Sequence, residues 1–129
     1  MTAELWTAPH ATSPLDATVD VPGSKSLTAR YLILAAVAST PSQIRGGLVS
    51  RDSSLMIEAL RTLGYTVDET GDRWLIGPGR PRGGVTVECG LAGTVMRFVP
   101  ALALLADGPV SFDGDEQARV RPMGPLVDA

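Results

Sequence analysis

Basic side chains beside a glycine turn are the residues of this chain best suited to chemistry. The stretch Pro-Gly-Ser-Lys-Ser-Leu-Thr-Ala-Arg brings together Lys25, Ser26 and Arg30. The alternating segment 17–21 before it and the apolar run 31–38 after it indicate a strand, a tight turn and a helix N-terminus. Free N–H groups and the helix dipole attract anions there. The stretch therefore predicts an anion site, although a capping serine with a solvated lysine and arginine is equally consistent with it.

Further basic residues stand in comparable places later in the chain. Arg97 follows the Gly-rich turn at 90–94, and both Arg119 and Arg121 precede a predicted final helix. In a chain of formal net charge −3, this gathering predicts a positive potential focused on a small anion. The competing interpretation pairs Arg97 and Arg119 with the acidic residues between 113 and 116.

Composition excludes several classes of protein. The acidic balance lacks the basic footprint of a nucleic-acid-binding protein. No apolar run reaches the length of a membrane span, and residues 1–15 lack the pattern of a signal peptide. The single Cys89 cannot form an internal disulfide, and with one histidine, His10, no metal-ligand spacing or Ser-His-Asp set exists. We therefore expect a cytoplasmic protein without a metal, a nucleic-acid partner or a membrane.

The elements that must position the basic residues repeat along the chain. Arg30 and Arg97 each follow a strand, a Gly turn and, four positions earlier, a small residue, Ser26 or Gly93. The same offset of about 67 residues relates Met56 to Met123. We interpret this as a β-α-β-α unit that occurs twice, the first copy being closed by a hairpin.

The repeat divides the chain into three expected parts. These are an N-terminal arm over 1–16, a first unit with hairpin and linker over 17–84, and an incomplete second unit over 85–129. The expected helices cover 27–38, 55–63, 95–106 and a stretch from Pro122, and the expected strands cover 17–21, 42–48, 65–69, 73–76, 85–87 and 110–112. The first helix is apolar on nearly every side and is expected to be buried all round. Asp52 is the expected cap of the second helix, and Pro100 predicts a kink or a late start in the third.

These motifs, in order and spacing, resemble the 5-enolpyruvylshikimate-3-phosphate synthase (3-phosphoshikimate 1-carboxyvinyltransferase) family. The matching segments are Pro22-Gly-Ser-Lys-Ser26 with Arg30, Asp52 with Met-Ile-Glu-Ala-Leu at 56–60, Leu91-Ala-Gly-Thr94 with Arg97, Asp113-Gly-Asp115, and Arg121-Pro-Met-Gly-Pro-Leu126. The resemblance implies transfer of the enolpyruvyl group of phosphoenolpyruvate to the 5-hydroxyl of shikimate 3-phosphate, through a tetrahedral intermediate and with loss of phosphate. It implies no metal and no organic cofactor.

The resemblance also implies roles for single residues. Lys25, Ser26 and Arg30 are expected to bind shikimate 3-phosphate; Lys25, Gly93 and Arg121 are expected to bind phosphoenolpyruvate; Thr94 and Arg97 are expected to support them. The carboxylates that exchange protons in the family have no counterpart here, so no catalytic acid or base is expected in this chain. Leu91 stands where many members have asparagine, which removes a hydrogen-bonding side chain.

The fold implied by the resemblance is an inside-out α/β barrel, with helices inside, sheets outside and substrates in a cleft between two such barrels. The enzyme that acts on UDP-N-acetylglucosamine shares this fold, but it typically has asparagine at the position of Ser26. A non-catalytic anion-binding module, or a structural partner that completes its barrel with another chain, remains an alternative. Because the second unit lacks its closing hairpin, we expect the chain alone to be inactive and to self-associate.

Overall fold

The computed structural model describes residues 6–128, and these form an α/β fold. The first five residues of the predicted arm, and Ala129 of the predicted second unit, lie outside the described residues. The helices are α1 (Lys25–Val37), α2 (Arg51–Thr62), α3 (Gly93–Ala103), α4 (Glu116–Arg119) and α5 (Gly124–Val127). The strands are β1 (Ser42–Arg45), β2 (Val67–Thr70), β3 (Arg73–Ile76), β4 (Val85–Glu88) and β5 (Val110–Asp113). Within the described residues, no helix is long and apolar enough to cross a membrane.

Two small sheets flank the helices. The first is antiparallel, with strand order β1-β3-β2, and its β2–β3 hairpin turns at Gly71, whose φ is +58°. The second pairs β4 with β5 in parallel, Val85 lying opposite Val110. Parallel neighbours need a long crossover, and α3 provides it. The predicted hairpin and the predicted strands from 85 and 110 are therefore confirmed.

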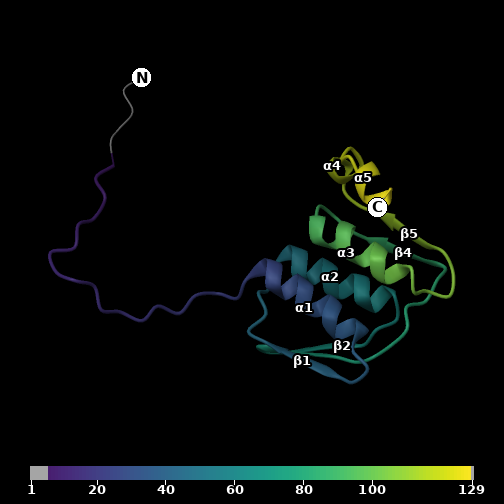
Figure 1. The fold of residues 1–129 in the computed structure, drawn as a ribbon, viewed down its shortest axis with the longest axis horizontal. Helices are drawn as coiled ribbons and strands as arrows, with labels where there is room; N and C mark the ends of the chain where they lie inside the picture. The colour runs from purple at the N-terminus through teal and green to yellow at the C-terminus, as the bar shows by residue number, and fades with distance from the viewer. Residues whose placement is uncertain (1–5, 129) are drawn as a thin grey trace.

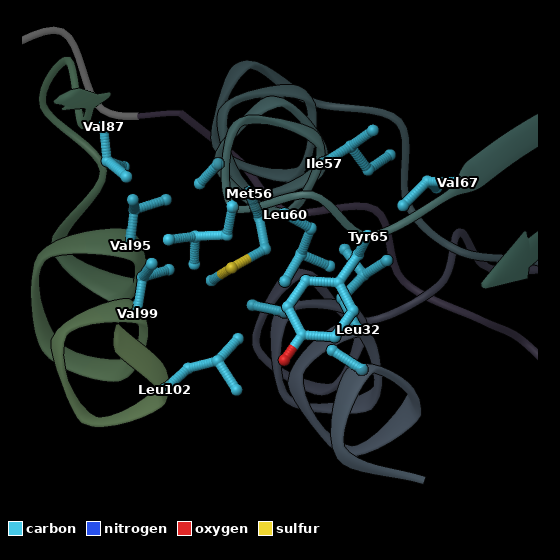
Figure 2. Close-up of a cluster of buried hydrophobic side chains, with 14 of the residues drawn as sticks. Leu32, Met56, Ile57, Leu60, Tyr65, Val67, Val87, Val95, Val99 and Leu102 are labelled. Atoms are coloured by element: carbon cyan, nitrogen blue, oxygen red, sulfur yellow. The ribbon is translucent and has the colours of Figure 1, made fainter. Parts of the chain in front are cut away.

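The core lies between α1, α2 and α3, which pack against one another (Figure 1). Leu32 of α1, Met56 and Leu60 of α2, and Val95 and Val99 of α3 are fully or almost fully buried. Figure 2 shows these side chains converging from the three helices. Trp74 of β3 and Cys89, which directly follows β4, are buried in the same core.

The predicted strand at 17–21 is wrong. These residues have no regular structure, and Val19 and Val21 are 74% and 78% exposed. A strand is held by hydrogen bonds to a neighbouring strand, and the described residues offer this segment none. In Figure 1 the chain before α1 runs away from the body of the fold.

The expectation that the first helix is buried on every side is also wrong. Leu27, Tyr31, Leu34 and Val37 of α1 are each about half exposed. They recur every three or four residues and so form one apolar face, while Leu32 and its neighbours face α2 and α3. The described elements cover only one side of this helix.

The starts of α2, α3 and α5 differ from prediction. α2 is capped by Ser50 in a capping box with Ser53, so Asp52 is not the cap; it lies inside the first turn. Gly64 directly follows the predicted helix range 55–63 and ends α2 with φ +100°. The helix predicted from Pro122 is present as the single-turn α5, which begins at Gly124, and the single-turn α4 before Pro122 was not predicted. Pro100 lies within α3, which begins early rather than late.

Candidate anion-binding site

The N-terminus of α1 presents the first basic residue. The Oγ of Ser24 caps the helix by accepting a hydrogen bond from the N–H of Leu27 (3.4 Å). Lys25 and Ser26 therefore occupy the first two helical positions. The Nζ of Lys25 lies 3.0 Å from Oδ2 of Asp52 at the start of α2, and the two side chains are 54% and 27% exposed. This ion pair brings the N-termini of α1 and α2 together.

The turn before α1 is held against the strand region behind it. A Cβ at Gly23 would overlap the carbonyl oxygen of Gly46, so the two backbone segments pass too closely for any larger residue. Thr28 Oγ1 donates to the carbonyl of Ser24 (2.9 Å) and accepts from the N–H of Leu48 (3.0 Å). These contacts fix the direction in which the first turn of α1 points.

Arg30 lies one turn further along and connects α1 with α3. Its Nη1 donates to the carbonyl of Ser26 (3.0 Å), and its guanidinium carbon lies 5.3 Å from the ring centroid of Phe98. Among the described residues its other nitrogens have no hydrogen-bond partner. Ser26 and Arg30 therefore share one face of α1, as their spacing predicted.

Two more guanidinium groups, those of Arg97 and Arg121, lie beside the N-terminus of α3. A Cβ placed on Gly93 would lie 3.0 Å from Nη1 of Arg97 and 3.6 Å from Nη1 of Arg121. Arg121 Nη1 also donates to the carbonyl of Leu91 (3.3 Å). Because the acceptor is a backbone carbonyl, this contact does not depend on the side chain at position 91, where leucine stands in place of asparagine. The Oγ1 of Thr94 is buried, and no hydrogen-bond partner for it exists in the described part of the chain.

A second ion pair ties α2 to the turn region of the parallel sheet. Arg51 Nη2 lies 2.7 Å from Oδ2 of Asp115, and the same guanidinium lies close to Gly90, just before α3. The hydrogen bond that Arg51 donates to the carboxylate of Asp115 raises the pKa of Arg51. Together with the contact between Lys25 and Asp52, this pair places the N-termini of α1, α2 and α3 at one end of the molecule.

Arg119 forms an ion pair with Asp113 through two hydrogen bonds. Its Nε and Nη2 donate to the two carboxylate oxygens of Asp113, each at 2.9 Å, and these bonds lower the pKa of Asp113. The ion-pair interpretation of Arg119 is thus confirmed. For Arg97, no ion pair is found among residues 6–128.

A pocket of about 420 Å³ lies beside Arg121. Its lining is mainly apolar and includes Met96, Phe112, Met123 and the buried Cys89, whose pKa is raised to about 11 by burial. Within residues 6–128 no group of three or more histidine, cysteine or acidic side chains could hold a metal ion. The basic groups described above make this end of the molecule a candidate site for anions.

Sequence reasoning did not find three contacts at this end of the molecule. Phe98 follows the family motif and carries no polar atom, so nothing in the sequence marks it. Asp52 was interpreted as a cap because acidic residues are common at helix starts. The contact between Arg51 and Asp115 joins residues 64 apart in the chain and cannot be seen from local patterns.

Comparison with known proteins gives a consistent set of relatives. The family model described as EPSP synthase (3-phosphoshikimate 1-carboxyvinyltransferase) matches residues 9–129. A 3-phosphoshikimate 1-carboxyvinyltransferase of Bifidobacterium longum (strain DJO10A) is 59% identical over 130 residues, which are 96% of this chain and 29% of that protein. A protein of the same name from Mycobacterium ulcerans (strain Agy99) is 56% identical over 131 residues, covering 98% of this chain and 30% of the relative.

The fold has a counterpart among solved structures. EPSP synthase from Acinetobacter baumannii superposes with a TM-score of 0.77 at 23% identity, over 85% of this chain and 26% of that one. At this identity the similarity concerns the fold. The chain spans about three tenths of the length of the curated relatives it matches.

Proposed function

The chain belongs to the EPSP synthase family, and we propose that its protein transfers the enolpyruvyl group of phosphoenolpyruvate to the 5-hydroxyl of shikimate 3-phosphate, releasing phosphate. The observation that carries this proposal is the shared end of α1, α2 and α3. There Lys25, Arg30, Arg97 and Arg121 accompany two helix N-termini. Both substrates are anions with phosphate and carboxylate groups, which this arrangement suits.

We assign shikimate 3-phosphate to the N-terminus of α1. Ser26 and Arg30 lie on one face of the helix, and four of the five N–H donors of Arg30 have no partner among the described residues. Lys25 stands beside them at the first helical position. A phosphate or carboxylate at this place receives charge-assisted hydrogen bonds from both basic groups.

Phosphoenolpyruvate is assigned to the N-terminus of α3. Gly93 has no side chain, so an anion can approach the backbone N–H groups between the guanidinium groups of Arg97 and Arg121. In this proposal Arg121 binds the anion directly, while Arg97 and Thr94 support the site. In this proposal Lys25 contacts both substrates, because the N-termini of α1 and α3 lie at the same end of the molecule.

The proposed reaction adds the 5-hydroxyl to the double bond of phosphoenolpyruvate and then expels phosphate. Fixed cations at the phosphate stabilise the negative charge on the departing group. Lys25 also has to exchange its partner Asp52 for a substrate anion, or share it with one. The carboxylates that move protons are expected in the part of the family sequence that this chain does not cover, and the proposal requires no metal or organic cofactor.

In the same proposal the chain forms part of an inside-out barrel, with units over 17–84 and 85–129 and an arm over 1–16. The exposed apolar face of α1 supports this, because a helix inside a barrel has to be covered on that side as well. In isolation the face favours self-association. The proposed location is the cytoplasm, where the protein acts on small molecules and not on nucleic acid.

The test is a phosphate-release assay with the full-length protein and both substrates, together with identification of the enolpyruvyl product. Phosphate release that requires both substrates supports the proposal. Binding of either substrate without product, by protein shown to be folded, would instead support an anion-binding module. The 129-residue chain alone is expected to release no phosphate above background.

A further inference from the structure

Phe98 is the side chain that holds Arg30 in place, and no motif of the sequence includes it. The Arg30 guanidinium lies 5.3 Å from the centre of the Phe98 ring, within the range of a cation–π interaction. Phe98 belongs to α3 and Arg30 to α1, so the contact crosses between two helices. The phenylalanine is partly buried and packs against the hydrophobic core, which restricts the movement of its ring.

The contact with Phe98 leaves most N–H donors of Arg30 available to an anion. An aromatic ring meets the flat face of a guanidinium, whereas anions bind its edge. Of the N–H donors at that edge, one bonds to the carbonyl of Ser26 at 3.0 Å. The ring and the carbonyl together restrain a long, solvent-exposed side chain without occupying its remaining donors.

We propose that Phe98 is a positioning residue for Arg30: it orders the guanidinium before shikimate 3-phosphate arrives and so increases the affinity for that substrate. The identity of the substrate rests on the function proposed above. The physical basis is preorganisation, because a side chain that is already ordered loses less rotamer freedom on binding. Phe98 itself touches no substrate in this proposal.

The primary measurement needs no ligand. In the ligand-free, full-length protein, the nuclear magnetic resonance order parameter of the Arg30 Nε–Hε bond reports how restricted the side chain is. We expect Phe98→Leu to lower it and Phe98→Tyr to leave it near the wild-type value, because tyrosine keeps the aromatic face. Phe112→Leu, which alters the only other phenylalanine of the chain, is the matched control and should leave Arg30 unchanged.

The second measurement is the affinity for shikimate 3-phosphate. We expect Phe98→Leu to weaken binding about two- to fivefold, the range of an exposed cation–π contact. In an Arg30→Ala background the same substitution should have no further effect, which a general packing defect would not produce. Phe98→Met, whose flexible side chain can fill an irregular space in the core, replaces Phe98→Leu if that variant does not fold.

An unchanged order parameter of Arg30 in Phe98→Leu overturns the proposal. The proposal also fails if Phe98→Leu weakens the binding of shikimate 3-phosphate equally in the presence and absence of Arg30. If the wild-type protein binds no shikimate 3-phosphate, the proposed function fails. A lowered order parameter in Phe98→Leu still supports the positioning of Arg30 in that case. The two failures are therefore distinguishable.

Discussion

Replacing Gly93 by alanine should weaken the binding of phosphoenolpyruvate while leaving the fold intact. The added methyl group would lie 3.0 Å from Nη1 of Arg97 and 3.6 Å from Nη1 of Arg121. Both neighbours are the ends of flexible side chains, so they can move by a few tenths of an ångström. In a helix, alanine is also more favourable than glycine by up to about 1 kcal/mol. We therefore expect the free energy of unfolding to change by no more than about 0.5–1 kcal/mol.

The expected effect on the substrate is larger. The methyl group occupies the space in which the anion would approach the helix N-terminus, and it displaces the two guanidinium groups. Loss of one charge-assisted hydrogen bond costs about 1.5–3 kcal/mol. This corresponds to an increase of about ten- to 150-fold in the KM for phosphoenolpyruvate. Because the substitution removes binding rather than a reacting group, kcat should fall much less.

The assay is steady-state kinetics of the full-length protein, with phosphoenolpyruvate varied at saturating shikimate 3-phosphate. Gly124→Ala is the matched control, because a Cβ at that glycine meets nothing within 4 Å. Thermal unfolding of both variants tests the expected stability. A KM for Gly93→Ala within twofold of wild type would refute the assignment of this helix end to phosphoenolpyruvate.

Three further predictions concern the core, the cysteine and the paired arginine. Leu60→Ala removes a fully buried side chain and should lower the free energy of unfolding by about 2–5 kcal/mol in urea titrations; a cost below 1 kcal/mol would contradict the described core. With its pKa near 11 instead of 9.0, Cys89 should react with a thiol reagent at pH 8 about a hundredfold more slowly than an ordinary cysteine, and faster as the pH rises towards 10. Arg119→Ala removes the bonds that lower the pKa of Asp113. Because its pKa is lowered in the folded protein, Asp113 stabilises the fold at pH values above its usual pKa of 3.8, and this stabilisation is lost as the pH falls. The variant should therefore lose less stability than wild type between pH 7 and pH 3. An equal loss in urea titrations at these two pH values would contradict the pairing.

The sequence predicted correctly those helices and turns that are determined by a few neighbouring residues. The amphipathic spacing of α2, its end at Gly64 and the turn at Gly71 are properties of a few neighbouring residues, and the structure has all three. The order of strand, helix and strand over 85–113 was also predicted, and this order allows the parallel pair β4–β5 that the structure has.

The errors arose where a partner decides the outcome. The alternation at 17–21 is typical of a strand, yet no described strand is available to pair with it. The apolar character of α1 predicted burial on every side, whereas burial depends on how many elements pack around the helix. Asp52 has the residue type of a cap, but Ser50 occupies that position and the carboxylate pairs with Lys25 across two helices.

The candidate site was predictable in its residue types and not in its contacts. The sequence singled out Lys25, Ser26, Arg30, Gly93 and Arg121, and the structure brings their helix ends to one end of the molecule. The contacts that hold these groups come from Asp52, Phe98 and the carbonyl of Leu91. Such contacts depend on how α1 packs against α2 and α3 and on the place of Arg121 beside the turn before α3, which no local pattern specifies.

The most direct test of the central claim is the turnover of Lys25→Ala in the full-length protein. Lys25 is about half exposed, and its role in this account is to bind reacting anions, so its loss should reduce turnover by about a hundredfold or more with little change in melting temperature. Arg45→Ala, which removes an exposed positive charge from β1, is the control and should leave turnover unchanged. Turnover of Lys25→Ala close to that of wild type would contradict the claim that the joined helix N-termini form the substrate site.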